Sequence, residues 1–154
     1  MSIRRAEEKD LPSVLDLNNR ESKWVGRKEI DFFKKYVDIP IFNVFETDER
    51  IVGFLMAMDQ NTNYDSINFL WFKDKFNKFY YIDRVIVDES MRGKGIASLL
   101  YRELIDIKLD IPLVAEVSIN PSNDGSVIFH EKIGFKEVGT LTSGDKKVRM
   151  YYLD

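Results

Sequence analysis

Cysteine is absent from the sequence, and histidine occurs only once, at position 130. The absence of thiols excludes disulfides, thiolate metal ligands and a covalent cysteine intermediate. One imidazole without thiols also disfavours a structural zinc site, so no metal is expected.

Long apolar runs and dense basic tracts are missing as well. No stretch approaches the ~20 apolar residues that span a bilayer, and the N-terminus leads into charged sequence without an apolar signal core. Lysines and arginines are interleaved with acids, and the net charge is −3. We therefore expect a cytoplasmic protein whose principal partner is neither a membrane nor a nucleic acid.

The chain has 154 residues, of which 44% are hydrophobic and 13% aromatic. This length and composition suffice for a packed globular domain without covalent staples. No repeat or linker divides the chain, so we predict a single domain over residues 1–154.

Apolar periodicity and turn residues predict an α+β fold. Strands are predicted at 2–6, 41–47, 51–58, 79–87, 112–119, 135–141 and 147–153, and helices at 11–17, 27–36, 93–108 and 123–133. Residues 59–78 are expected to be irregular. Asp10 is a candidate cap of the first helix, Gly53 marks a bulge or a close approach, and Gly134 is a candidate C-cap. Antiparallel strands, then a β-α-β-α unit, then a hairpin favour a mixed sheet.

The turn between strand 79–87 and the next helix reads Arg92-Gly93-Lys94-Gly95-Ile96-Ala97. Glycine has no Cβ, so backbone N–H groups there can approach a phosphate closely. The first N–H groups of a helix have no intrahelical partner, and the helix dipole favours an anion at that end. Two basic side chains add positive charge. The segment therefore predicts a diphosphate cradle built mostly from backbone.

Three other interpretations of this turn compete with that prediction. A dinucleotide fold requires a third glycine where Ser98 stands, and an acid ending the next strand, whereas Glu116 lies inside it. A nucleotide P-loop is absent. The remaining alternative is that the glycines only allow the chain to turn into the helix and that no ligand binds there.

Two motifs resemble signatures of the GNAT family of N-acetyltransferases. The first is Arg92-x-x-Gly95-x-Ala97, which matches [QR]-x-x-G-x-[GA]. The second is Asn123-x-x-Ser126-x-x-x-His130-x-x-x-Gly134-Phe135, which is similar to the late N-x-x-A-x-x-x-Y-x-x-x-G-F signature. The opening residues 3–11 resemble the first strand and helix of that family. Residues 64–85 resemble a small bacterial subgroup without an assigned acceptor, so the resemblance covers essentially the whole chain.

The resemblance implies a GNAT-like fold, with a mostly antiparallel sheet of about seven strands and about four flanking helices. Strands 79–87 and 113–119 are expected to run parallel and then splay apart, so that the pantetheine arm of acetyl-CoA (coenzyme A) enters the gap. The expected cofactor-binding residues are Val85, Ile86, Val87, Arg92, Gly93, Lys94, Gly95, Ile96, Ala97, Asn123 and Ser126.

Acetyl transfer requires a neutral amine, a stabilised oxyanion and a proton for the leaving thiolate. The resemblance implies that Asp83 is the general base, and Glu116 on the neighbouring strand is the competing candidate. His130 stands where the family tyrosine donates a proton to the thiolate. Each of the three has a structural alternative: an ion pair or solvated carboxylate for the acids, and packing for the histidine.

The acceptor-side candidates are Trp24, Tyr64, Asn68 and Trp71, together with the Asn18-Asn19 pair after the first helix. The other aromatic residues between 69 and 81 are expected to pack in the core. The predicted partner is a small-molecule or peptide amine. A homodimer through the closing hairpin is also open, because dimers are common in the family.

Two functional hypotheses follow, and a third is kept as a contrast. The first is an N-acetyltransferase that transfers acetyl directly within a ternary complex. The second is a non-catalytic acyl-CoA sensor or partner-binding module of the same fold, which the missing tyrosine favours. The third, a nicotinamide-dependent enzyme, would bind nucleotide without competition from acetyl-CoA.

Overall fold

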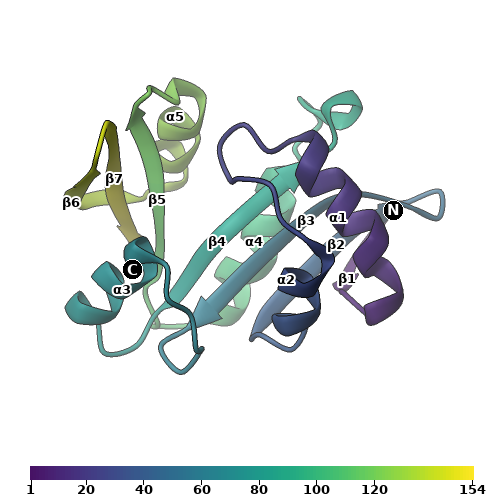
Figure 1. Ribbon diagram of the computed structural model, residues 1–154, viewed down its shortest axis with the longest axis horizontal. Coiled ribbons are helices and arrows are strands. Elements are labelled where there is room, and N and C mark those ends of the chain that lie inside the picture. Colours follow the sequence, from purple (N-terminus) through teal and green to yellow (C-terminus); the bar gives the residue numbers. More distant parts are fainter. The chain divides into compact units, whose positions relative to one another are not determined.

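The computed structural model describes residues 1–154. Its strands are β1 (Ser2–Arg5), β2 (Ile41–Thr47), β3 (Arg50–Asp59), β4 (Tyr80–Val87), β5 (Leu113–Asn120), β6 (Lys136–Ser143) and β7 (Lys146–Leu153). Its helices are α1 (Leu11–Arg20), α2 (Ile30–Lys35), α3 (Ile67–Lys75), α4 (Ile96–Lys108) and α5 (Asp124–Ile133), with 3-10 turns η1 (Glu8–Asp10) and η2 (Glu89–Met91) (Figure 1). None of these helices combines the length and apolar character that crossing a membrane requires.

The seven strands form one sheet in the order β1-β2-β3-β4-β5-β7-β6. The pairs β1–β2, β2–β3, β5–β7 and β6–β7 are antiparallel. Strands β4 and β5 are parallel, with Tyr80 opposite Leu113 and Tyr81 opposite Val114. The predicted mixed, mostly antiparallel sheet of seven strands is therefore confirmed.

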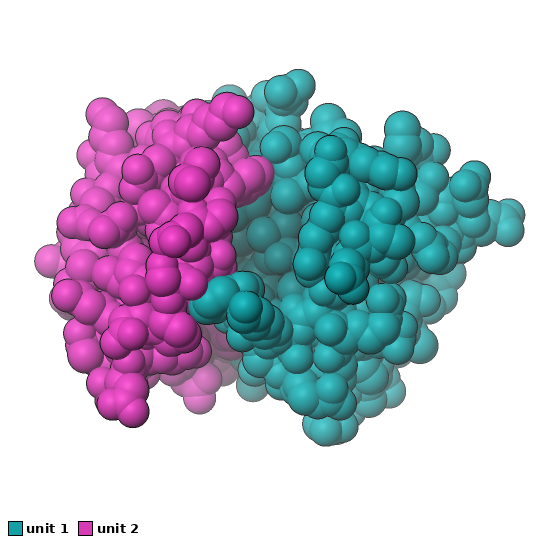
Figure 2. Space-filling view, turned by 90° about the horizontal axis from the view of Figure 1, so that it is seen from above, with its two compact units in different colours: residues 1–58, 82–109 teal, residues 59–81, 110–154 magenta.

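Backbone contacts divide the chain into two compact units, which Figure 2 shows in different colours. Unit 1 contains residues 1–58 and 82–109, and unit 2 contains residues 59–81 and 110–154. The boundary crosses β4 between Tyr81 and Ile82, so this strand contributes to both units. The assignment of the whole chain to a single domain stays a prediction.

In unit 1, helices pack on both faces of the sheet. A Cβ on Gly53 would lie 3.2 Å from Ile96 of α4, so α4 covers the face to which position 53 points. The next residue, Phe54, points to the other face, because successive side chains of a strand alternate. There it packs against Phe33 of α2, with ring centroids 6.0 Å apart. Figure 1 shows α1 and α2 on one side of this sheet and α4 on the other. The predicted close approach at Gly53 is confirmed.

In unit 2, the core gathers around aromatic side chains of α3 and β4. Phe69 lies 5.6 Å and Phe72 lies 5.8 Å from the Tyr81 ring, between centroids, and all three are buried. Gly134 ends α5 with a φ of 122° and donates its N–H to the carbonyls of His130 and Glu131, which confirms the predicted C-cap. Aromatic residues between positions 69 and 81 were expected to pack in the core, and these three buried rings do so.

The prediction that residues 59–78 are irregular was wrong, because they contain α3 and bring the number of α-helices to five. The Ser66 side chain accepts a hydrogen bond from the Phe69 N–H and begins this helix. Its buried side is apolar, but Ile67 and Leu70 are also apolar and are 55% and 46% exposed. Because apolar residues lie on both sides of α3, its sequence lacks the one-sided apolar pattern that predicts an amphipathic helix.

Three helix boundaries also differ from the prediction. Helix α1 ends at Arg20 rather than at position 17, so Asn18 and Asn19 lie within it. Helix α4 begins at Ile96 rather than at position 93, because Gly93 and Gly95 have φ values of 78° and 80° that an α-helix does not allow. Helix α2 begins at Ile30 rather than at position 27.

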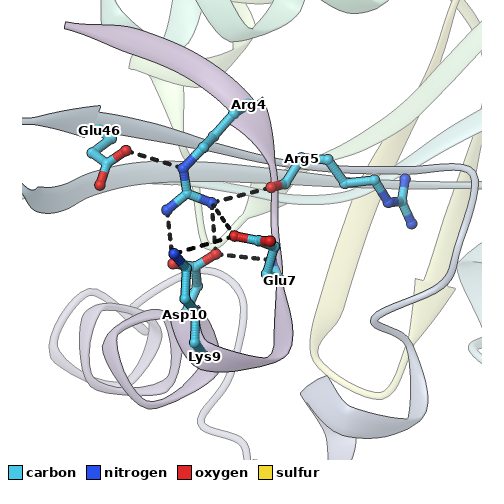
Figure 3. Close-up of polar contacts among 6 residues, drawn as sticks. All are labelled: Arg4, Arg5, Glu7, Lys9, Asp10 and Glu46. Carbon is cyan, nitrogen blue, oxygen red and sulfur yellow. Dashed lines mark hydrogen bonds and ion pairs between the residues drawn. The ribbon is translucent and has the colours of Figure 1, made fainter.

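Asp10 is the N-cap residue of α1, as predicted, but its side chain makes no cap hydrogen bond and instead connects the start of α1 to the first strand. Its two carboxylate oxygens accept hydrogen bonds of 2.7 and 2.8 Å from the Arg4 guanidinium (Figure 3). One of them also accepts from the Glu7 N–H at 2.8 Å, and Arg4 Nε donates to Glu46 of β2 at 3.0 Å. Hydrogen bonding from Arg4 holds the pKa of Asp10 below its ordinary value.

We predict that Asp10→Asn lowers the free energy of unfolding by about 2 kcal/mol, because the partly buried Arg4 guanidinium loses the carboxylate that accepts two of its hydrogen bonds. The folded-state pKa of Asp10 is depressed, so this contribution is present above pH 3.8 and is lost as the pH falls through the folded-state pKa. Urea unfolding at pH 7 measures it. Asp16→Asn, which breaks an exposed ion pair with Arg20, is the control and should change stability by less than about 0.5 kcal/mol. Equal effects of the two substitutions would contradict this account.

Candidate functional site

The turn from β4 into α4 has the geometry of an anion cradle. Both Gly93 and Gly95 have left-handed backbone, and no atom lies within 4 Å of the position that a Cβ would take at either. The Leu99 N–H donates to the Gly95 carbonyl at 3.0 Å. The N–H groups of residues 96–98 therefore precede the first intrahelical hydrogen bond and are available to a ligand. Residues 92–95 are exposed, so the cradle is open to solvent.

Arg92 of this turn is engaged by a carboxylate from the end of α1. Glu21 accepts hydrogen bonds from the Arg92 guanidinium and, at 3.1 Å, from the Glu89 N–H. The neighbouring Asp88 accepts from the N–H and the hydroxyl of Ser90, which lowers the pKa of Asp88. Sequence analysis missed Glu21, because it lies 71 residues from Arg92 along the chain.

The predicted pantetheine-binding residues are the last three residues of strand β4, Val85, Ile86 and Val87. Ile86 is buried and its carbonyl lies 3.2 Å from where a Gly53 Cβ would be, whereas the two valines are half-buried. Strand β4 therefore leads directly into the cradle, and both belong to unit 1.

Asp83, the first base candidate, forms a buried ion pair within unit 1. Its Oδ2 accepts a 2.7 Å hydrogen bond from Arg84 Nε, and the two side chains are 5% and 3% exposed. Arg84 also donates to the side chain of Asn18 at 2.9 Å. The negative charge of Asp83 is thus compensated by a neighbouring guanidinium.

Glu116, the competing base candidate, has a different environment in unit 2. Its Oε1 accepts hydrogen bonds from the Tyr81 hydroxyl at 2.9 Å and from Asn68 Nδ2 at 3.0 Å. Both donors are uncharged groups, and they orient this carboxylate oxygen. The structure thereby brings together two predicted site residues, Glu116 and Asn68, and adds Tyr81, which was predicted only as an aromatic core residue.

His130 is 4% exposed and lies inside unit 2. Its Nδ1 is 2.8 Å from the Ser126 carbonyl, and because a carbonyl only accepts, Nδ1 carries the hydrogen. Burial lowers the pKa of this imidazole, partly opposed by that hydrogen bond. The ring is also stacked on Tyr151, with centroids 6.0 Å apart. The neutral tautomer leaves Nε2 without a proton, which is the opposite of what a thiolate acid needs.

The other late-motif residues begin helix α5. The Asn123 side chain accepts a hydrogen bond from the Ser126 N–H at 3.3 Å, which is an N-cap interaction. Ser126 Oγ lies 3.3 Å from His130 Nδ1. These contacts account for both residues structurally, and their predicted role in cofactor binding stays a prediction.

The acceptor-side candidates have separate environments. Trp24 is 37% exposed, with the Lys23 ammonium 5.0 Å from its ring centroid. Tyr64 packs edge-on against Phe69. Trp71 lies against β6, where a Cβ at Gly139 would come within 2.6 Å of its ring. Asn68 donates a hydrogen bond to Glu116, a predicted catalytic residue, at 3.0 Å.

No group of three or more His, Cys, Asp or Glu side chains is arranged to hold a metal ion. The chemical groups that the described geometry provides are an anion cradle in unit 1 and an oriented carboxylate in unit 2.

Comparison with known proteins identifies one family. The model described as Acetyltransferase (GNAT) family matches residues 5–135. An aminoglycoside N(6')-acetyltransferase type 1 from Klebsiella pneumoniae is 33% identical over 66 residues, which are 42% of this chain and 33% of that protein. An L-2,4-diaminobutyric acid acetyltransferase from Halalkalibacterium halodurans is 36% identical over 92 residues, 58% of this chain and 41% of that protein. The chain thus spans less than half the length of these curated relatives.

Among solved structures, an N-acetyltransferase from Staphylococcus aureus Mu50 is similar over its full length. It is 27% identical and has a TM-score of 0.72, with 99% of this chain and 97% of that chain covered.

We predict that the stability of the protein falls as the pH drops below about 6.5, because the unfolded chain then takes up a proton that folded His130 resists. His130→Gln removes this dependence, and His130 is the only histidine in the chain. Urea unfolding at pH 7.5 and 5.5 should show about 1 kcal/mol less loss in the variant than in the wild type. An identical loss in both proteins would show that the folded state protonates His130 freely.

Proposed function

Because the chain belongs to the GNAT acetyltransferase family, we propose that it transfers an acetyl group from acetyl-CoA to a primary amine. Transfer is direct, within a ternary complex, since the sequence has no cysteine to carry the acetyl group. Residues 1–154 act in this proposal as one acyltransferase domain. The family match supports this activity more than the alternative of a non-catalytic acyl-CoA sensor.

The observation that carries the proposal is the cradle at Gly93 and Gly95. Its left-handed glycines, open Cβ positions and available N–H groups fit the pyrophosphate of coenzyme A. Lys94 and Arg92 would add charge, with Arg92 exchanging Glu21 for the phosphates. The backbone of residues 85–87 would bind the pantetheine arm, and Asn123 and Ser126 remain proposed cofactor contacts.

Glu116 is the better-placed general base of the two carboxylates. A base must accept a proton from the acceptor ammonium, directly or through water. Asp83 Oδ2 accepts a hydrogen bond from the Arg84 guanidinium at 2.7 Å, whereas Glu116 Oε1 accepts from the Tyr81 hydroxyl and the Asn68 amide, which orient it. The same carboxylate would also attract the cationic form of the amine.

We propose that His130 does not donate the proton to the leaving thiolate, because Nε2 of its neutral ring carries none. That residue occupies the family tyrosine position, but its burial and its bond to the Ser126 carbonyl favour the neutral ring. If His130 were the acid that protonates the thiolate, its replacement would lower kcat by a factor of about 10²–10⁴. We expect His130→Gln to change kcat far less than that and to act chiefly on stability.

The acceptor is proposed to be a small-molecule or peptide amine bound in a bacterial cytoplasm. The relatives named above act, by their names, on an aminoglycoside and on a diamino acid, and they support the small-molecule class. Trp24, Tyr64, Asn68 and Trp71 remain the proposed acceptor contacts. A homodimer through the β6–β7 hairpin is a further part of the proposal.

We predict that an amine acceptor accelerates the release of free thiol from acetyl-CoA, and that Glu116→Gln lowers kcat about 100-fold or more. Glutamine keeps an oxygen for the donors Tyr81 and Asn68 but cannot take a proton, so stability and acetyl-CoA affinity should stay unchanged. A thiol-reactive dye measures the rate with kanamycin, 2,4-diaminobutyrate and an alanine-initiated peptide as acceptors.

Asp83→Asn is the matched control, since it also replaces a carboxylate by its amide. It should lower the free energy of unfolding by about 3 kcal/mol, because the buried Arg84 loses its partner. If Asp83→Asn abolishes turnover in a folded protein while Glu116→Gln does not, Asp83 is the base. If the wild type binds acetyl-CoA but no amine accelerates thiol release, the sensor hypothesis is favoured over the enzyme.

A further inference from the structure

Arg84 is a buried charge that the proposed chemistry does not use. Its side chain is 3% exposed, which leaves it no access to a substrate. Besides the ion pair with Asp83, it donates to Asn18 Oδ1 at 2.9 Å and lies 4.9 Å from the centre of the Phe32 ring. Burying a guanidinium is costly unless it is paired and hydrogen-bonded, and these three contacts meet that condition only while their partners stay in place.

The partners of Arg84 lie on both sides of one loop. Residues 21–29 connect α1 to α2, Asn18 belongs to the last turn of α1, and Phe32 belongs to α2. Arg84 therefore contacts the helix that enters the loop and the helix that leaves it. Because it stands on the central strand β4, it fixes both ends of the loop to the sheet.

Two asparagines extend this attachment into the loop itself. Asn18, which is fully buried, donates from Nδ2 to the Gly26 carbonyl at 3.2 Å. Asn19 binds the Lys28 backbone twice, accepting from its N–H at 2.9 Å and donating to its carbonyl at 3.0 Å. Side-chain bonds to backbone of this kind order a loop that has no regular structure of its own.

The loop also touches the cofactor cradle. Glu21, its first residue, binds Arg92 and the Glu89 N–H. Trp24, an acceptor-side candidate, lies three residues further on. The loop is thus attached to the cradle at its beginning and to the buried Arg84 at both of its helices.

We propose that Arg84 is a positioning residue that holds loop 21–29 beside the cradle, so that the loop is pre-formed for the acceptor amine. This proposal rests on the proposed acetyl transfer for the identity of the ligand, but the attachment of the loop is independent of it. Arg84 acts through Asn18 and the loop, and it touches neither acetyl-CoA nor the amine. Its loss therefore affects acceptor binding and leaves cofactor binding and the chemical step in place.

Limited trypsin digestion tests the attachment without any substrate, because Lys23, Arg27 and Lys28 lie in the loop. Arg84→Lys keeps a positive charge for Asp83 but cannot also make the planar guanidinium contacts to Asn18 and Phe32. Cleavage after Lys23 and Arg27, followed by mass spectrometry, should be roughly tenfold faster than in the wild type, the factor expected for losing one or two buried hydrogen bonds. Asp16→Asn, one turn earlier on α1, is the control and should be cleaved like the wild type.

Asn19→Ala provides a second variant that should fold even if Arg84→Lys does not, because Asn19 is only half-buried. It removes both bonds to Lys28 and should raise cleavage to a similar extent. Urea unfolding of each variant separates loop opening from global unfolding. Wild-type cleavage rates in folded Arg84→Lys, or in Asn19→Ala where Arg84→Lys does not fold, would overturn the proposal.

Steady-state kinetics then test whether the loop positions the acceptor. The substrate is whichever of kanamycin, 2,4-diaminobutyrate and the peptide reacts fastest. Arg84→Lys should raise KM for that acceptor roughly tenfold, while kcat and the Kd of acetyl-CoA change by less than about twofold. A fall in kcat at unchanged KM would overturn the positioning role. Failure of the wild type to bind acetyl-CoA would instead overturn the proposed function, and the digestion result would still stand for Arg84.

Discussion

The left-handed backbone at Gly93 and Gly95 is the constraint on which the proposed site depends. It turns the chain from the end of β4 into α4 within a few residues, so a buried strand and the free N–H groups of a helix become neighbours. A side chain at either glycine would be strained by the positive φ and would project into the space that an anion needs. The cradle is thus a property of the backbone, and its basic side chains only add to it.

The two candidate bases, Asp83 and Glu116, have different hydrogen-bond donors. In unit 1, a carboxylate and a guanidinium are both nearly inaccessible and neutralise one another, which suits the fixing of structure. In unit 2, Glu116 accepts hydrogen bonds from the Tyr81 hydroxyl and the Asn68 amide. Two carboxylates on neighbouring strands therefore differ in the donors that bind them, a guanidinium for Asp83 and a hydroxyl and an amide for Glu116.

The sequence predicts features whose cause is local. The strands follow from alternating and β-branched residues, and the cradle follows from six consecutive residues. The missed helix α3 has apolar residues on both of its sides, which removes the periodic signal. The environment of Glu116 could not be predicted, because its donors are 35 and 48 residues away in sequence. The Arg84–Asn18 contact is likewise non-local, with 66 residues between its ends.

Sequence patterns also misplaced the role of polar residues near helix ends. Asp10 satisfies the usual rule for a cap, yet its carboxylate binds Arg4 and the Glu7 N–H. Asn18 and Asn19 are predicted to follow the first helix, yet they lie in its last turn and join it to the following loop. Such residues have several backbone and side-chain partners within reach, and only the tertiary structure selects among them.

The most direct test of the central claim is a calorimetric titration of acetyl-CoA into the wild type, Gly95→Trp and Gly144→Trp. Gly144, in the β6–β7 turn, also has a positive φ and an open Cβ position, so its substitution carries the same backbone strain outside the cradle. We predict micromolar binding by the wild type and by Gly144→Trp, and no binding by Gly95→Trp. Absence of binding by the wild type, or equal binding by all three proteins, would contradict the assignment of the cradle to coenzyme A.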